Sequence, residues 1–168
     1  MKLFMAVLGG NCGNSNIEVH DVRFVVGESI DGCLDQLRRE WYGDAKGLHL
    51  DSYTEVTAVE GYRIEVSHQP PAPTSPKLFF VNVGGYLPGK FLEFHDIGLY
   101  GCHSSHEAKQ VALKQLLASY EQSHRDDLYE VDNCIEVNLL DRHYIHLVTD
   151  ETAVTQGPTW YGYRPIDR

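Results

Sequence analysis

Residues 2–10 read KLFMAVLGG and residues 77–85 read KLFFVNVGG, so one apolar segment with a glycine pair occurs twice in the chain. Identities continue at the same spacing of 75 residues, with eight matches in the twenty positions 2–21. Later matches have a spacing of 81, as between Asp51 and Asp132. A repeat of this length predicts two copies of one structural unit, and it constrains the fold more than any single motif.

The 168 residues therefore divide into two repeats, a joint and a tail. We expect repeat one at 1–68, a proline-rich linker at 69–76, repeat two at 77–148 and a C-terminal aromatic tail at 149–168. Four prolines between positions 70 and 76 cannot join a sheet ladder, which favours an extended linker. A unit of about 70 residues is marginal alone, whereas the fused pair can bury a substantial core.

Each repeat is predicted to fold as ββαββ. The first strand, Leu3–Leu8 or Leu78–Val83, is an unbroken apolar run, typical of a central strand that the following glycine pair ends. After a second strand comes a helix capped by Ser29 or Ser104, then a third strand, Leu50–Ala58 in repeat one, and a fourth. The sequence predicts an α+β fold of mainly antiparallel sheet with the helices packed on one side. A pseudo-twofold axis should relate the copies, by analogy with dimers.

The composition narrows the class of partner. A net charge of −10 and a pI near 5.2 argue against nucleic acid and against an anionic membrane, because both require a basic face. The apolar run after Met1 is too short for a signal peptide core or a membrane span. The four cysteines form no close pair in sequence, which is typical of a reduced cytoplasmic protein.

Three segments of repeat one, KLFMAVLGG, EVHDVRFVVGES and EV-x4-GYRI, resemble the bacterial domain-of-unknown-function family 1543, whose domain occurs in one or two copies per chain. The resemblance covers both repeats. Repeat two departs at the helix entry, where Cys102-His103-Ser104 replaces Gly27-Glu28-Ser29. The resemblance implies the tandem architecture and brings no activity, cofactor or partner with it.

The repeated pairs His20-Asp21 and His95-Asp96 are the first candidate site. Adjacent strand residues face opposite ways, and His20 shares its parity with apolar Val22. We therefore expect both imidazoles to be mostly buried on the core-facing side, with a ring nitrogen bonded to backbone or to a carboxylate. Two interpretations stay open. The histidines sit at the core edge while the aspartates order the preceding loop, or they bind a ligand or act catalytically at the mouth of a pocket.

The glycine pairs Gly9-Gly10 and Gly84-Gly85 are the second candidate. They suit a tight strand-exit turn, and exposed N–H groups in such a turn could also hold an anion. The spaced histidine pairs His103/His106 and His143/His146 have no counterparts in repeat one, so the sequence predicts no metal and no other cofactor. No nucleophile motif is present either.

The sequence thus favours a non-catalytic binding or interaction module. The alternative is a small enzyme or ligand-handling protein with its site near the paired glycine and His–Asp loops. The tail carries three aromatic residues within Trp160–Tyr163, which would be costly to leave in water. We expect the tail to dock in one of three ways: on its own body, on a second copy in a homo-oligomer, or on a foreign partner.

Overall fold

A computed structural model describes residues 1–116 and 131–167 of the chain. The fold is α+β, and the described residues form eleven strands and two helices. All strand pairs among them are antiparallel. No helix in these residues is both long and apolar enough to span a membrane.

The first sheet belongs to repeat one and contains the tail. Its strand order is β11-β3-β1-β2. The elements are β1 (Lys2–Gly10), β2 (Val19–Gly27), α1 (Ile30–Glu40), β3 (His49–Glu55) and β11 (Trp160–Pro165). The predicted cap is present, because the Gly32 N–H donates to Ser29 Oγ at 3.3 Å.

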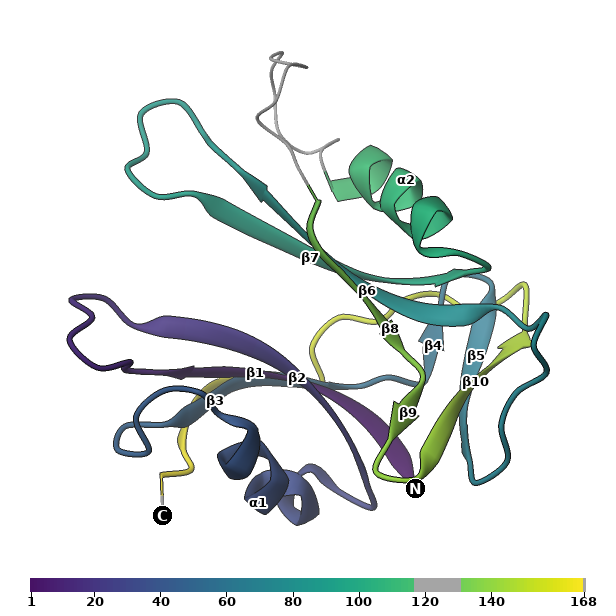
Figure 1. Cartoon of the computed structure of the whole chain (residues 1–168), viewed down its shortest axis with the longest axis horizontal. Coiled ribbons are helices and arrows are strands. Elements are labelled where there is room, and N and C mark those ends of the chain that lie inside the picture. Colours follow the sequence, from purple (N-terminus) through teal and green to yellow (C-terminus); the bar gives the residue numbers. More distant parts are fainter. Residues whose placement is uncertain (117–130, 168) are drawn as a thin grey trace.

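Repeat two builds the matching sheet, in the order β7-β6-β8. Its elements are β6 (Lys77–Gly85), β7 (Phe94–Cys102), α2 (Ser105–Leu116) and β8 (Val131–Val137). The predicted capping box is confirmed: the Glu107 N–H donates to Ser104 Oγ, and the His103 N–H donates to Glu107 Oε2. Each helix covers one face of its own sheet, and the two helices lie on opposite outer sides of the molecule (Figure 1).

A third sheet joins the repeats, in the order β4-β5-β10-β9. Its strands are β4 (Ala58–Val59), β5 (Tyr62–Ser67), β9 (Leu139–Leu140) and β10 (His143–Thr149). Glu65 and His146 are matched positions at the repeat spacing of 81, and they pair with each other in the ladder. The pseudo-twofold axis therefore passes between these two residues. Residues 68–76, which follow β5, contain no helix or strand.

The predicted third strand, Leu50–Ala58, is divided between two sheets. β3 ends at Glu55, and Ala58 already belongs to β4 of the third sheet. Val56 lies between them, with its N–H donating to the Leu3 carbonyl at 2.9 Å and its side chain 4 % exposed. This buried valine is where the chain leaves the first sheet, a change of sheet that apolar periodicity does not reveal.

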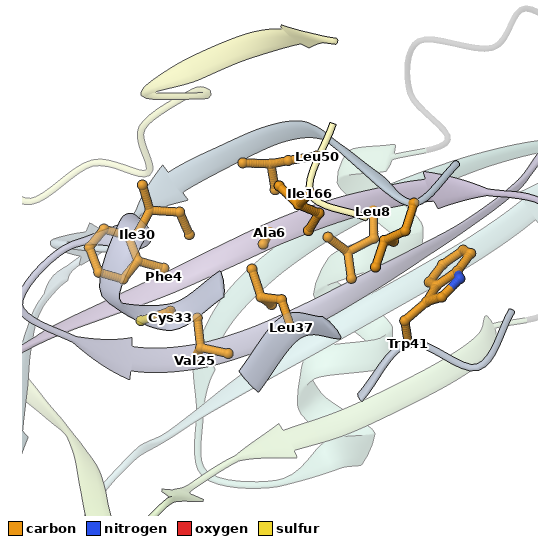
Figure 2. Packing of buried hydrophobic residues seen from close by; sticks show 11 residues of the cluster. Phe4, Ala6, Leu8, Val25, Ile30, Cys33, Leu37, Trp41, Leu50 and Ile166 are labelled. Atoms are coloured by element: carbon orange, nitrogen blue, oxygen red, sulfur yellow. The ribbon is translucent and has the colours of Figure 1, made fainter. Parts of the chain in front are cut away.

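Three apolar clusters hold the layers together. One packs α1 on the first sheet (Figure 2), and its smaller counterpart packs α2 on the second. The third cluster fills the space between the repeats, where β1, β2, β6 and β7 meet the joining sheet. The members from β2 and β7 that face this shared core are Val22, Phe24, Val26, Ile97 and Leu99. Beyond this shared core, the β1–β2 hairpin and the β6–β7 hairpin extend to the same side of the molecule (Figure 1).

The tail docks on its own body. β11 pairs with β3, and Trp160 stacks on Tyr53 with ring centroids 6.1 Å apart. Ile166 is 2 % exposed in the core under α1 (Figure 2), and its N–H donates to the Leu48 carbonyl. The aromatic tail thus completes the sheet of repeat one.

Candidate functional site

The two repeated histidines lie on the predicted face but are not buried. His20 follows the parity of Val22 and points to the side of the shared core, as His95 does with Ile97. Their side chains are nevertheless 53 % and 51 % exposed. The predicted burial is wrong because the shared core ends at Val22 and Ile97, one inward-facing position before each histidine.

The repeated aspartates face the other side, so neither joins its neighbouring histidine. Asp21 Oδ1 accepts the N–H of Val22 at 2.8 Å, and Asp96 Oδ1 accepts the N–H of Ile97 at 3.0 Å. Asp21 also pairs with Arg23 at 2.6 Å. These matched bonds fix the local backbone of the second strand, which is a structural role.

Repeat one gathers four ionisable side chains at the loop end of its β1–β2 hairpin, which we call the repeat-one cluster: Glu18, His20, His49 and Asp51. His20 Nε2 lies 3.3 Å from Asp51 Oδ2 and 3.7 Å from Glu18 Oε2. His49 Nε2 lies 3.2 Å from Asp51 Oδ1 and 3.3 Å from Glu18 Oε1. Each carboxylate thus faces both imidazoles, one with each of its oxygens.

His49 is the buried member of the cluster, 1 % exposed at the start of β3. Its Nδ1 lies 2.8 Å from the Gly47 carbonyl oxygen. Tyr163 of the tail covers the ring, with centroids 4.3 Å apart. These contacts fix the orientation of the imidazole and direct Nε2 towards the two carboxylates.

Gly9 makes room for the cluster. It pairs with His20 on one side and with His49 on the other. A Cβ at this position would lie 2.6 Å from His49 Nε2 and 2.9 Å from Asp51 Oδ2, so only glycine lets these two side chains pack against the strand here. The ladder also shifts between the pairs Leu8–Leu50 and Val7–Ser52, which makes Asp51 the extra residue of a β-bulge. Bulges commonly redirect a side chain beside a functional site.

The glycine pairs lie within the ladder rather than in a strand-exit turn. Gly10 pairs with Val19 in β2, and a Cβ on it would lie 3.0 Å from the Trp41 ring on the α1 side. In repeat two, Gly84 pairs with His95 and Gly85 with Phe94. Of the four glycines, Gly9 and Gly84 oppose the candidate histidines.

Repeat two reproduces part of this arrangement. His95 Nε2 lies 3.7 Å from Glu93 Oε2, the same separation as between His20 and Glu18. The ladder shift recurs at Asp132, between the pairs Val83–Val131 and Asn82–Asn133. The side chain of Asp132 and all of Glu130, the sequence counterpart of His49, lie outside the described part.

Sequence reasoning therefore missed three members of the cluster. Glu18 and Asp51 do recur as Glu93 and Asp132, and this signal could have placed them beside the histidines. His49 left no such signal, because repeat two has glutamate at its position.

The cluster lies away from three surface cavities, and the described residues show no metal-binding geometry. Three surface cavities of about 330, 310 and 370 Å³ are lined by other residues, and none includes a member of the repeat-one cluster. Within residues 1–116 and 131–167, no group of three or more His, Cys, Asp or Glu side chains is placed to hold a metal ion. The site is thus an open surface cluster with one buried imidazole beneath it.

Comparison with known proteins places this geometry in context. A domain of unknown function, DUF1543, matches residues 15–66 and 90–140, which include both Glu–His pairs. The crystal structure of a protein Il1583 from Idiomarina loihiensis is 35 % identical, with a TM-score of 0.75. That match covers 98 % of this chain and 97 % of the other. No curated protein matches the chain.

Proposed function

This chain belongs to the DUF1543 family, and on that premise we propose that it is a non-catalytic binding module. Its ligand site is the repeat-one cluster, and the Glu93–His95 pair forms a second, partial site. The observation that carries the proposal is the matched Glu–His pair, with the same Nε2–Oε2 separation of 3.7 Å in both repeats.

Fold stability does not account for these pairs. The side chains of His20 and His95 are about half exposed, and those of Glu18 and Glu93 are 44 % and 36 % exposed. Exposed ion pairs of this kind contribute about 0–1 kcal/mol. The shared core already ends at Val22 and Ile97, so packing does not require a histidine at the next position. A function in recognition explains why both repeats present the same pair.

Binding is favoured over catalysis by what surrounds the cluster. None of the three cavities includes a member of the cluster, so none of them encloses the cluster away from water. In the described part of the chain, no hydroxyl or thiol is bonded to Glu18, His20, His49 or Asp51. An acid–base site needs a reacting partner held within hydrogen-bond reach.

One observation supports the alternative, a small enzyme or ligand-handling protein. His49 is buried, oriented through Nδ1 and aimed at two carboxylates, an arrangement that suits proton transfer to a bound substrate. Such a substrate would bring the reacting group that the cluster itself does not contain.

Native mass spectrometry of untagged protein tests the proposal. Wild-type protein purified under gentle conditions should carry additional mass that His20→Gln loses while its melting temperature is unchanged. Asp21→Asn is the matched control, because Asp21 lies next to His20 on the opposite face of β2. Retention of the same mass by His20→Gln, or its loss in Asp21→Asn alone, would contradict a site at the cluster.

A further inference from the structure

We propose that the outer edge of β8 pairs with the same edge of a second copy of this chain, so that two molecules form one continuous antiparallel sheet. This surface is separate from the repeat-one cluster, and the inference does not depend on the ligand site. It comes from a difference between the repeats. The outer edge of β3 is covered by β11, whereas among the described residues no strand covers the matching edge of β8.

The two edges occupy the same place in their repeats. β3 pairs with β1 and β8 pairs with β6, in the same register and with a ladder shift at the same point. Lys2 forms a salt bridge of 2.9 Å with Glu55 in repeat one. Lys77 forms a salt bridge of 2.9 Å with Glu136 in repeat two. The backbone groups that β3 turns towards the tail therefore have direct counterparts in β8.

Those backbone groups of β3 are bonded to the tail. The Tyr53 carbonyl accepts the N–H of Thr159 at 2.9 Å, and the Glu55 N–H donates to Thr159 Oγ1 at 2.9 Å. The counterparts of Tyr53 and Glu55 in repeat two are Cys134 and Glu136. Because the register is the same, the backbone N–H and C=O groups of these two residues point to the outer edge of β8. A row of such groups is a template for another strand.

The exposure of β8 differs accordingly from that of β3. Ile135 is 44 % exposed, whereas its counterpart Thr54 is only 7 % exposed. Edge strands commonly avoid pairing by carrying proline, lysine or other charges. The segment Asn133–Val137 contains neither proline nor lysine, and its one acid, Glu136, is paired with Lys77. This edge is therefore open to another strand.

The tail of a second copy does not fit the edge of β8. In repeat one, the tail is held by Trp160, which stacks on Tyr53, and by Ile166, which is buried under α1. Repeat two has Cys134 in place of Tyr53, so the stacking partner is missing. Each tail is also already paired with β3 of its own chain.

The β8 strand of a second copy does fit, with Ile135 on the twofold axis. A twofold axis places the same surface on both partners, and it relates two antiparallel strands. This register puts the two exposed Ile135 side chains opposite each other and Cys134 opposite Glu136 of the partner subunit. Centring the pairing on Cys134 would instead oppose Asp132 and Glu136. Apolar cross-strand pairs stabilise a sheet, whereas like charges directly opposite destabilise it.

Sedimentation velocity of the full-length chain tests the dimer, from micromolar to near-millimolar concentration. Wild type should dimerise reversibly at the upper end, because one strand pair buries less area than a standard interface. Ile135→Lys should raise the dissociation constant by about tenfold or more, since it opposes two like charges. Val154→Lys is the matched control, because Val154 is 58 % exposed and lies beside β7, and it should leave the dimer unchanged. If Ile135→Lys fails to fold, Ile135→Thr, which installs the residue found at this position in repeat one, should still weaken the dimer.

Disulfide formation tests the register. In a Cys134→Ser background, Ile135→Cys should give a linked dimer on mild oxidation. The Cα atoms of a non-hydrogen-bonded antiparallel pair lie about 4.5 Å apart, which is within disulfide range. Glu136→Cys in the same background should stay unlinked, since position 134 of the second copy lies opposite. Peptide mass spectrometry identifies the cysteines that are joined.

The contrary results are equally specific. A wild-type chain that stays monomeric throughout, or a dimer that Ile135→Lys leaves intact, would overturn the inference. Loss of the dimer in Tyr161→Ala alone would assign the contact to the tail instead. A disulfide through Glu136→Cys but not through Ile135→Cys would overturn the proposed pairing.

Discussion

A Cβ on Gly9 would lie 2.6 Å from Nε2 of His49, so the close packing of the repeat-one cluster depends on the absence of a methyl group at this position. Gly9→Ala should lower the free energy of unfolding by about 1–3 kcal/mol through overpacking, and it should also abolish ligand binding. Chemical denaturation measures the first effect. Gly157→Ala is the control, since nothing lies within 4 Å of a Cβ there, and it should be neutral. Equal effects at the two positions would contradict this account of Gly9.

The histidines of the cluster should differ in their effect on stability. His20→Gln and His95→Gln should each change the free energy of unfolding by no more than about 0.5 kcal/mol, because both side chains are half exposed. His49→Gln should cost about 1–3 kcal/mol, because it breaks the buried bond to the Gly47 carbonyl. Urea denaturation of the three variants decides this. A large loss with His20→Gln would restore the structural interpretation of the repeated histidine.

The docked tail provides a third prediction. Ile166→Ala should cost about 2–5 kcal/mol, since its side chain is buried under α1, whereas Tyr161→Ala should be nearly neutral at 80 % exposure. Thermal unfolding compares the two. A homo-oligomer contact through Tyr161 and Tyr163 stays a proposal. If it exists, Tyr161→Ala should reduce the oligomer in sedimentation experiments without changing monomer stability.

Stability should fall at alkaline pH because of Cys102. Burial, with a smaller effect from Glu107, raises the pKa of this thiol from 9.0 to about 11. The folded chain therefore holds the proton more tightly than the unfolded chain does. The resulting stabilisation is complete below about pH 9 and is lost as pH rises towards about 11. Denaturation of wild type and Cys102→Ala across this range should show a smaller pH slope in the variant, and equal slopes would contradict the shifted pKa.

The sequence predicted the repeat, the α+β class and both helix caps because these depend on local pattern and periodicity. It also predicted the correct face for His20 and His95, since strand parity fixes direction. It could not predict their exposure, which depends on how far the facing repeat covers each hairpin. The change of sheet at Val56 and the pairing of β11 with β3 are long-range contacts of the same kind.

His49 escaped prediction for a different reason. Repetition was the main signal in this chain, and it draws attention to residues present in both copies. His49 faces Glu130 in the sequence alignment of the repeats, so the buried centre of the cluster is the member that the repeat does not mark. Asymmetry within a repeat can thus indicate function, provided that the fold shows what surrounds the differing residue.

The most direct test of the central claim is a high-resolution crystal structure of the full chain, purified without a metal-affinity tag and inspected for a co-purified ligand. The account predicts density for a bound molecule within hydrogen-bond distance of Glu18 or His20, the exposed members of the repeat-one cluster. It predicts no such density in Gly9→Ala. Density for water alone above the cluster, in protein prepared in this way, would contradict the claim that the repeat-one cluster is a ligand site.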